Sequence, residues 1–144
     1  MKNTAIILTL FLLFSCNNVN KNDNIHSIKM MLDDQVKAWN SGDIDGFMKG
    51  YHKDSSMQFI SKKGCRKGWE NTLVAYKKHY PNKDSMGKLI FDLDEIEFLD
   101  QSQELGHVTG KWRLIRTADT PSGYFSLITK KINSEYKIII DHTW

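Results

Sequence analysis

Apolar residues recur at helical spacing between residues 25 and 51. From about Ile25 to Asn40 the apolar positions lie three or four residues apart, which is typical of a helix with one buried face. That face consists of Ile25, Ile28, Leu32, Val36 and Trp39. Asp23 or Asn24 can cap the start of this helix, and Gly42 suits its end.

The same spacing predicts two further helices. Asp43 can cap the first of them, whose buried face would consist of Ile44, Phe47, Met48 and Tyr51. This helix forms a hairpin with the preceding one around the Ser41-Gly42 turn. The third helix begins after Gly68, and Pro81 ends it because proline cannot continue a helix. Its apolar stripe consists of Trp69, Leu73, Tyr76 and Tyr80.

Apolar and polar residues alternate in the rest of the chain, which favours β-structure. Strands are expected at about residues 56–61, 89–98, 105–117, 124–131 and 136–143. Leu89 and Phe91 share one face of their strand, but the alternation slips before Ile96. An extra residue at Asp94-Glu95 would restore a single apolar face, which is the signature of a β-bulge.

The last two strands are expected to pair through a two-residue loop at Asn133-Ser134. Regular pairing from this loop places Phe125 opposite His142. Opposed residues share a face of the sheet, so His142 is predicted on the apolar, concave face. Asp141 is then predicted on the other face.

These elements predict an α+β domain in which three N-terminal helices pack on a curved antiparallel sheet. The bulge helps the sheet to bend, and helices against its concave face would leave a cavity. The length of 144 residues suggests a single domain, over residues 25–144.

The first residues have the form of a secretion signal. Lys2 supplies a positive charge, and the apolar run from Ala5 to Phe14 is too short to span a bilayer. The segment Leu13-Phe14-Ser15-Cys16 resembles the bacterial lipobox, in which the cysteine is acylated and becomes the mature N-terminus. We therefore expect a signal peptide over residues 1–15, lipidation at Cys16 and a polar tether over residues 16–24.

Lipidation implies attachment to the bacterial cell envelope. Cleavage before Cys16 leaves 144 − 15 = 129 residues, enough for one hydrophobic core. Asn17 follows the cysteine where an aspartate would signal retention in the inner membrane, so the resemblance favours the outer membrane. Cys65 is then the sole remaining cysteine, so no intrachain disulfide can form, and it is expected to lie half-buried in a strand.

The charge pattern narrows the range of partners. The net charge of +3 is mild, and with no nucleic-acid motif and a secretion signal we expect no nucleic-acid partner. One basic cluster stands out, formed by Lys62, Lys63, Arg66 and Lys67. A solvated turn is favoured there over a surface for acidic lipid headgroups or an acidic partner. The segments His52-Lys53-Asp54 and Asp141-His142 lack a third ligand, so neither a metal nor another cofactor is expected.

Three segments resemble the nuclear transport factor 2-like superfamily. Within this superfamily, the chain looks most similar to the SnoaL-like branch, which is often found in secreted bacterial proteins. The three segments are residues 36–43 (VKAWNSGD), 123–128 (GYFSLI) and 136–144 (YKIIIDHTW), where Tyr136 replaces a tryptophan common in the family. The resemblance covers roughly Ile25 to Trp144 and implies a cone-shaped fold. This fold hosts isomerases, dehydratases, hydrolases, binding modules and dimerisation domains, so it does not by itself imply a reaction.

A histidine at the end of an apolar face is a plausible general acid or base, and His142 is the candidate. Tyr51 and Tyr76 add hydroxyls that can hold a carbonyl or an oxyanion. Aromatic residues expected to line the pocket for an apolar ligand are Trp39, Phe59, Trp69, Trp112 and Phe125.

The resemblance implies catalytic groups in the cone that this sequence does not clearly supply. In ketosteroid isomerase-like members an acid in the cone transfers a proton beside a tyrosine. Here the strand acids Asp92, Asp94 and Glu97 have the wrong parity or lie at the bulge. Scytalone dehydratase-like members use several histidines, whereas His79 and His107 are expected to point outward.

Three functions remain open. The first is a lipid-anchored module that binds a small apolar molecule in the cone. The second is a lyase or isomerase with His142 as its acid or base. The third is a structural module that forms a homodimer through the open sheet face, where Ile115, Ile128 and Ile139 are expected to point outward.

Overall fold

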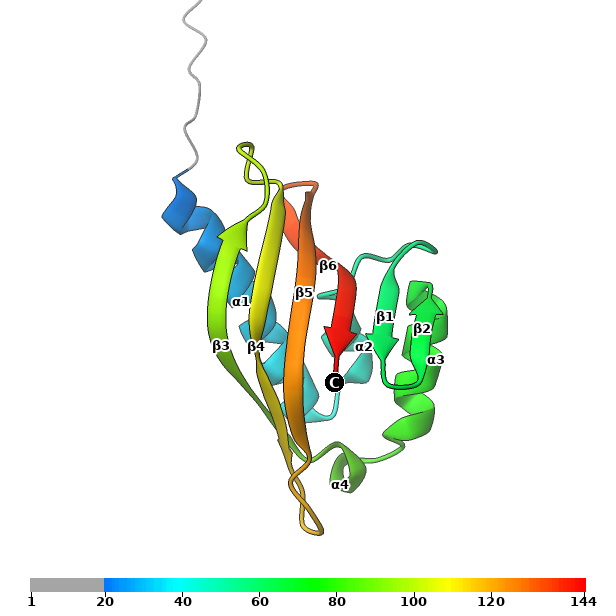
Figure 1. Ribbon diagram of the computed structural model, residues 1–144. Helices are drawn as coiled ribbons and strands as arrows, with labels where there is room; N and C mark the ends of the chain where they lie inside the picture. The colour runs from blue at the N-terminus through cyan, green and yellow to red at the C-terminus, as the bar shows by residue number, and fades with distance from the viewer. Residues whose placement is uncertain (1–19) are drawn as a thin grey trace, which may run out of the picture.

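A single six-stranded sheet organises residues 20–144, the part of the chain that the computed structural model describes (Figure 1). Its strands are β1 (Gln58–Ser61), β2 (Gly64–Lys67), β3 (Lys88–Phe98), β4 (Leu105–Ile115), β5 (Ser122–Ile132) and β6 (Glu135–Thr143). The helices are α1 (Lys21–Ser41), α2 (Ile44–Met48), α3 (Trp69–His79) and α4 (Lys83–Met86). The α+β fold and the curved sheet predicted from the sequence are confirmed.

The sheet is mixed rather than wholly antiparallel. The strands lie in the order β2-β1-β6-β5-β4-β3, and β1 runs parallel to β6. The expectation of an antiparallel sheet was wrong at this edge. Here β1 pairs with β6, the last strand of the antiparallel run from β3 to β6, and the two strands point in the same direction. The parallel pair sets Phe59 beside Asp141, and this register brings both residues to one side of the sheet.

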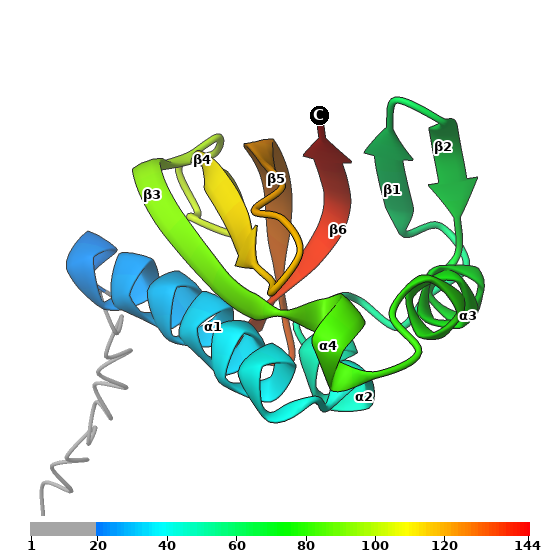
Figure 2. The ribbon, with the colours of Figure 1, turned by 90° about the horizontal axis from the view of Figure 1, so that it is seen from below.

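The helices cover one face of the sheet and leave the other open. Figure 2 shows α1 running along the face formed by β3 to β6, with α3 beside the β1–β2 hairpin. Ile28 and Leu32 of α1 are buried with Val108 of β4 in the core. This packing follows the predicted apolar stripe of the first helix.

The first helix begins earlier than predicted. It starts at Lys21 because the side chain of Asn20 accepts a hydrogen bond from the amide of Asn22. Four residues of the expected tether are therefore helical. Asn24 is buried among them, and its amide group bonds Gln103 and Lys131. The predicted end at Gly42, with φ of 88°, is confirmed, as is the cap of the second helix by Asp43.

Two short elements were missed. In the basic cluster expected to form a turn, Lys62 and Lys63 do so, but Arg66 and Lys67 lie in β2, which pairs with β1. Cys65 on this strand is exposed rather than half-buried. After Pro81, Asn82 and Ser85 form a capping box that starts α4. None of the helices within residues 20–144 is long and apolar enough to cross a membrane. The expected signal peptide and the lipidation of Cys16 lie outside the described residues.

Two bulges shape the curved sheet. The predicted bulge at Asp94-Glu95 is confirmed, since the pairing of β3 with β4 shifts between Leu93 and Glu95. A second bulge was not predicted. In the pairing of β5 with β6, Thr129 lies opposite Ile138, but its neighbour Ile128 lies opposite Ile140. Ile139 is therefore the extra residue, and all residues after it change face.

Candidate functional site

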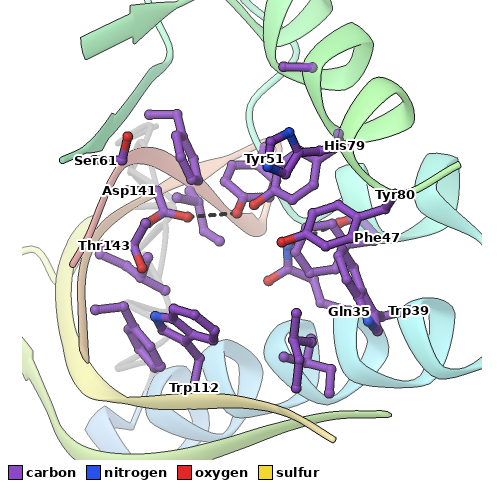
Figure 3. A pocket seen from close by; sticks show the side chains of 18 of the residues that line it. Gln35, Trp39, Phe47, Tyr51, Ser61, His79, Tyr80, Trp112, Asp141 and Thr143 are labelled. Atoms are coloured by element: carbon purple, nitrogen blue, oxygen red, sulfur yellow. Dashed lines mark hydrogen bonds between the residues drawn. The ribbon is translucent and has the colours of Figure 1, made fainter. Parts of the chain in front are cut away.

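A cavity of about 460 Å³ lies between the concave face of the sheet and the helices (Figure 3). Small-molecule sites in proteins typically measure about 300–1,000 Å³. The sheet contributes apolar and aromatic side chains to its wall, namely Leu89, Phe91, Trp112, Leu114, Phe125, Leu127 and Ile138. The cavity that the sequence predicted inside the cone is therefore present.

One carboxyl group lies inside this apolar wall. Asp141 on β6 is 6% exposed, and its Oδ2 accepts a hydrogen bond of 2.7 Å from the hydroxyl of Tyr51. Tyr51 follows α2 and is 4% exposed. Its backbone lies beside Ile138 in an isolated parallel bridge, which fixes the tyrosine against β6. The acid and the tyrosine therefore form one buried pair on the cavity wall.

Burial changes the acidity of this pair. It raises the pKa of Asp141 to about 7, although the hydrogen bond from Tyr51 opposes the rise. Burial and the nearby Asp141 carboxyl hold the pKa of Tyr51 well above its ordinary value, and the same two causes raise the pKa of Tyr76. Asp141 can thus carry or release a proton near neutral pH, while both phenols remain protonated.

Three buried polar atoms on the cavity wall have no hydrogen-bond partner among the described residues. They are Asp141 Oδ1, Gln35 Oε1 and Trp112 Nε1. The amide nitrogen of Gln35 donates to Phe47 O at 3.0 Å, so its orientation is fixed while its oxygen stays unpaired. A Cβ at Gly50 would come within 2.5 Å of Gln35 Cδ, so glycine at this position leaves the space that the Gln35 side chain occupies.

The helical side of the cavity is formed by aromatic rings. Trp39 meets Phe47, Tyr76 and Tyr80 edge to face, with centroid distances of 5.0, 6.0 and 4.8 Å. The Trp39 indole also donates to Met86 O at 3.1 Å, which holds the ring in place. Such contacts produce a rigid apolar wall that suits an aromatic or aliphatic ligand.

Most of the site residues predicted from the sequence meet in this cavity. Those that line it are Trp39, Tyr51, Phe59, Tyr76, Trp112 and Phe125. Trp69 is not among the lining residues, because its indole turns to α2 and donates to Met48 O at 2.9 Å. His79, expected to point outward, is exposed and lies at the edge of the cavity.

The predicted positions of His142 and Asp141 were both wrong. His142 is exposed, lies opposite Ser126 and has its ring centroid 4.9 Å from that of Trp144. The bulge at Ile139 is the physical reason, because one extra residue exchanges the faces of everything that follows it. The structure gives Asp141 the position inside the cone that the sequence analysis gave to His142.

A signal for this bulge existed in the sequence. Ile138, Ile139 and Ile140 are three consecutive branched apolar residues, which no regular strand with one polar face contains. The same kind of slip located the bulge in β3. Applied to β6, it would have predicted Asp141 inside the cone.

A row of three hydrogen-bonded polar side chains lies on the outward face of the sheet. His107 Nε2 lies 2.9 Å from Ser126 Oγ, and His107 Nδ1 lies 3.0 Å from Glu97 Oε1. The order of groups resembles a nucleophile, base and acid. None of these three side chains lines the cavity in the cone, so the cavity cannot hold a substrate against them. Within residues 20–144, no three His, Cys, Asp or Glu side chains gather as metal ligands would.

Comparisons with known proteins extend these observations. No protein-family model and no curated protein sequence matches the chain. Among solved structures, an NTF2-like protein of unknown function from Shewanella oneidensis is 41% identical. The match covers 83% of this chain and 97% of that one, with a TM-score of 0.79.

More distant structures share the fold alone. A domain of unknown function with a cystatin-like fold from Nostoc punctiforme is 16% identical over 86% of this chain and 78% of that one, with a TM-score of 0.71. An NTF2-like superfamily protein from Salmonella enterica is also 16% identical, over 87% and 92%, with a TM-score of 0.64. Because of the identity and coverage with the Shewanella protein, the chain belongs to the NTF2-like family.

Proposed function

We propose that this protein binds a small, mostly apolar molecule in the cone and that a polar group of this molecule contacts Asp141. The observation that carries the proposal is the unpartnered Oδ1 of a buried carboxyl group on the wall of a cavity of about 460 Å³. A buried polar atom without a partner costs about 1–3 kcal/mol, so a ligand that supplies a partner gains from it. The aromatic wall would hold the rest of the ligand by burial of apolar surface.

A fluorescent probe tests this proposal on the domain alone. The Shewanella oneidensis relative is matched over 97% of its chain, so a domain of this extent folds by itself, and residues 20–144 suit the experiment. N-phenyl-1-naphthylamine is neutral and apolar and becomes fluorescent in a dry pocket. We expect it to bind the wild-type domain with saturation.

Two tryptophan variants on α3 locate the probe. Ala75 lines the cavity, so Ala75→Trp fills it and should abolish binding. Val74, its neighbour, is 65% exposed, so Val74→Trp adds the same ring outside the cone and should leave binding unchanged. Equal binding by both variants, or no binding by the wild type, would contradict the proposal.

The pKa of Asp141 supports a second function, a lyase or isomerase. A general acid or base works best with a pKa near the operating pH, and that of Asp141 is about 7. Asp141 would take the role that the sequence analysis gave to His142. As a base, its carboxylate would remove a proton from the carbon next to a carbonyl group, and the carbonyl oxygen would accept a hydrogen bond from Tyr76.

Hydrogen–deuterium exchange tests this reaction. 2-Tetralone has acidic protons beside its carbonyl group and is small enough to enter the cavity of about 460 Å³. In deuterated buffer, the enzyme proposal predicts that the domain accelerates exchange at this carbon, as measured by proton NMR. Asp141→Asn should abolish the acceleration while probe binding is retained, and Asp33→Asn, on the exposed side of α1, should not change it. Equal exchange with and without the wild-type domain would leave binding as the function.

The expectations about the cell envelope remain part of the proposal. Lipidation at Cys16 would hold the domain at a bacterial membrane, with the outer membrane favoured. Mass spectrometry of the protein purified from a bacterial host with a lipoprotein pathway tests this. We expect an acylated N-terminus at Cys16 and its loss in Cys16→Ala.

The expected homodimer is also still a proposal. The outward face of the sheet supports it with Ile115 and Tyr124, which are 45% and 47% exposed. Sedimentation of the domain should then give a dimer, and Tyr124→Lys should shift it to the monomer.

A further inference from the structure

Three basic side chains form part of the cavity wall at its exposed edge. Lys62, Lys63 and Arg66 come from the β1–β2 hairpin, which Figure 2 shows standing to one side of the cone. Both lysines are exposed, and Arg66 is half-buried, with its guanidinium 5.8 Å from the ring centroid of Phe59. The hairpin thus brings positive charge to the end of an apolar wall.

Nearby carboxylates pair with some basic residues of the described domain but not with these three. Six other lysines or arginines form salt bridges with nearby carboxylates, namely Lys37, Lys53, Lys77, Arg113, Arg116 and Lys137. Within residues 20–144, no such salt bridge involves Lys62, Lys63 or Arg66.

Acidic side chains are scarce on the cavity wall. Asp141 is the one acidic side chain among the lining residues, and burial raises the pKa of this acid to about 7. Near neutral pH the lining side chains therefore carry an excess of positive charge. A positively charged opening attracts anions and speeds their entry.

We propose that the ligand of the cone is an amphipathic anion, an aromatic or aliphatic body that ends in a carboxylate, sulfonate or phosphate group. This inference rests on the proposed binding function. The body lies among the rings of the cone, a polar atom contacts Asp141, and the anionic end lies against Lys62, Lys63 and Arg66. The unpartnered Trp112 Nε1 on the wall is a donor that suits a ligand with an acceptor along its length.

A pair of matched probes isolates the charge of the ligand. 8-Anilinonaphthalene-1-sulfonate has the skeleton of N-phenyl-1-naphthylamine with one added sulfonate. The proposal predicts that the wild-type domain binds the sulfonate probe about tenfold more tightly than the neutral one, since three partly exposed charge contacts each contribute a modest factor. Ala75→Trp should abolish binding of both probes, which would show that both occupy the cone.

The basic residues are then removed together. In Lys62→Ala/Lys63→Ala/Arg66→Ala the preference for the sulfonate, measured as the ratio of the two affinities, should fall to near onefold. A matched control removes three exposed lysines that do not line the cavity, Lys29, Lys49 and Lys130, and thus changes the net charge equally. This control should keep the preference for the sulfonate probe, because the lysines that it removes do not line the cavity.

The outcomes separate this inference from the proposed function. If the neutral probe binds the cone but the sulfonate has no advantage, the anion proposal is wrong and the binding function stands. The anion proposal is also wrong if the hairpin variant and the control lose the preference equally. If neither probe binds the cone, the binding function itself fails. If the hairpin instead serves acidic lipid headgroups, its removal leaves the ratio of the two affinities unchanged, which also contradicts the anion proposal.

Discussion

The hydroxyl of Tyr51 lies 2.7 Å from Oδ2 of Asp141, so a buried hydrogen bond joins residues 90 positions apart inside the cone. One partner follows the short helix α2, and the other lies on β6 after the bulge at Ile139. The contact ties the helical layer to the sheet next to the cavity. It also places an ionisable group where an apolar ligand would meet it.

The raised pKa of Asp141 predicts a specific dependence of stability on pH. The folded-state pKa is about 7 and the ordinary value is 3.8, so between these values the folded protein binds more protons than the unfolded chain. Stability therefore falls as pH rises through this window, by an amount from Asp141 on the order of 4 kcal/mol. Asp141→Asn removes this contribution. In urea unfolding from pH 4 to pH 8, the free energy of unfolding of the variant should increase relative to that of the wild type as pH rises.

The matched control for this experiment is Asp33→Asn, which changes an exposed acid on α1. Its stability relative to the wild type should stay nearly constant over the same pH range. A constant difference between Asp141→Asn and the wild type would mean that Asp141 titrates as an exposed acid does.

Tyr51→Phe should raise the pKa of Asp141 further. The hydroxyl stabilises the ionised carboxylate, so its loss favours the protonated form. A hydrogen bond to a charged group contributes about 1.5–3 kcal/mol, which corresponds to about one to two pKa units. Tyr80→Phe also removes a hydroxyl from the cavity wall but not the bond to Asp141, and should leave this pKa unchanged. Carbon-13 NMR of the Asp141 carboxyl group reports both values.

Two tryptophans on the cavity wall should respond differently to replacement by phenylalanine. The Trp39 indole donates to Met86 O in the core, so Trp39→Phe leaves a buried carbonyl unpaired and should cost about 1–3 kcal/mol. The Trp112 nitrogen has no partner to lose, so Trp112→Phe should cost less than about 1 kcal/mol. Equal losses in thermal unfolding would contradict these roles.

The loop between β5 and β6 offers a stabilising change. Asn133 and Ser134 have φ values of 49° and 70°, the left-handed region that a two-residue hairpin loop requires. Serine is strained there and glycine is not, so Ser134→Gly should stabilise the domain by about 0.5–1 kcal/mol. Asn133→Gly should gain less, because asparagine tolerates this conformation. Thermal unfolding of both variants decides the point, and a loss of stability in Ser134→Gly would refute it.

Local patterns predicted much of this fold. The stripe from Ile25 to Trp39 predicted the first helix, and the slip before Ile96 predicted the bulge in β3. The loop at Asn133-Ser134 was predicted because two-residue hairpins have a narrow sequence signature. Each of these features depends on residues that are close in sequence.

The features that were missed depend on distant contacts. The parallel pairing of β1 with β6 joins segments about 80 residues apart, and no local pattern reports it. Trp69 shares the stripe of its helix, but its indole is drawn away from the cavity by Met48 O. The face of Asp141 was wrong because regular alternation was assumed through Ile139, where the sheet bulges.

The most direct test of a buried, ligand-facing acid is a pH titration of the Asp141 carboxyl group by carbon-13 NMR in the wild-type domain. We expect a pKa of about 7 and a change in this value when N-phenyl-1-naphthylamine fills the cone. A pKa near the ordinary 3.8, unaffected by the probe, would contradict this position of Asp141 in the cone.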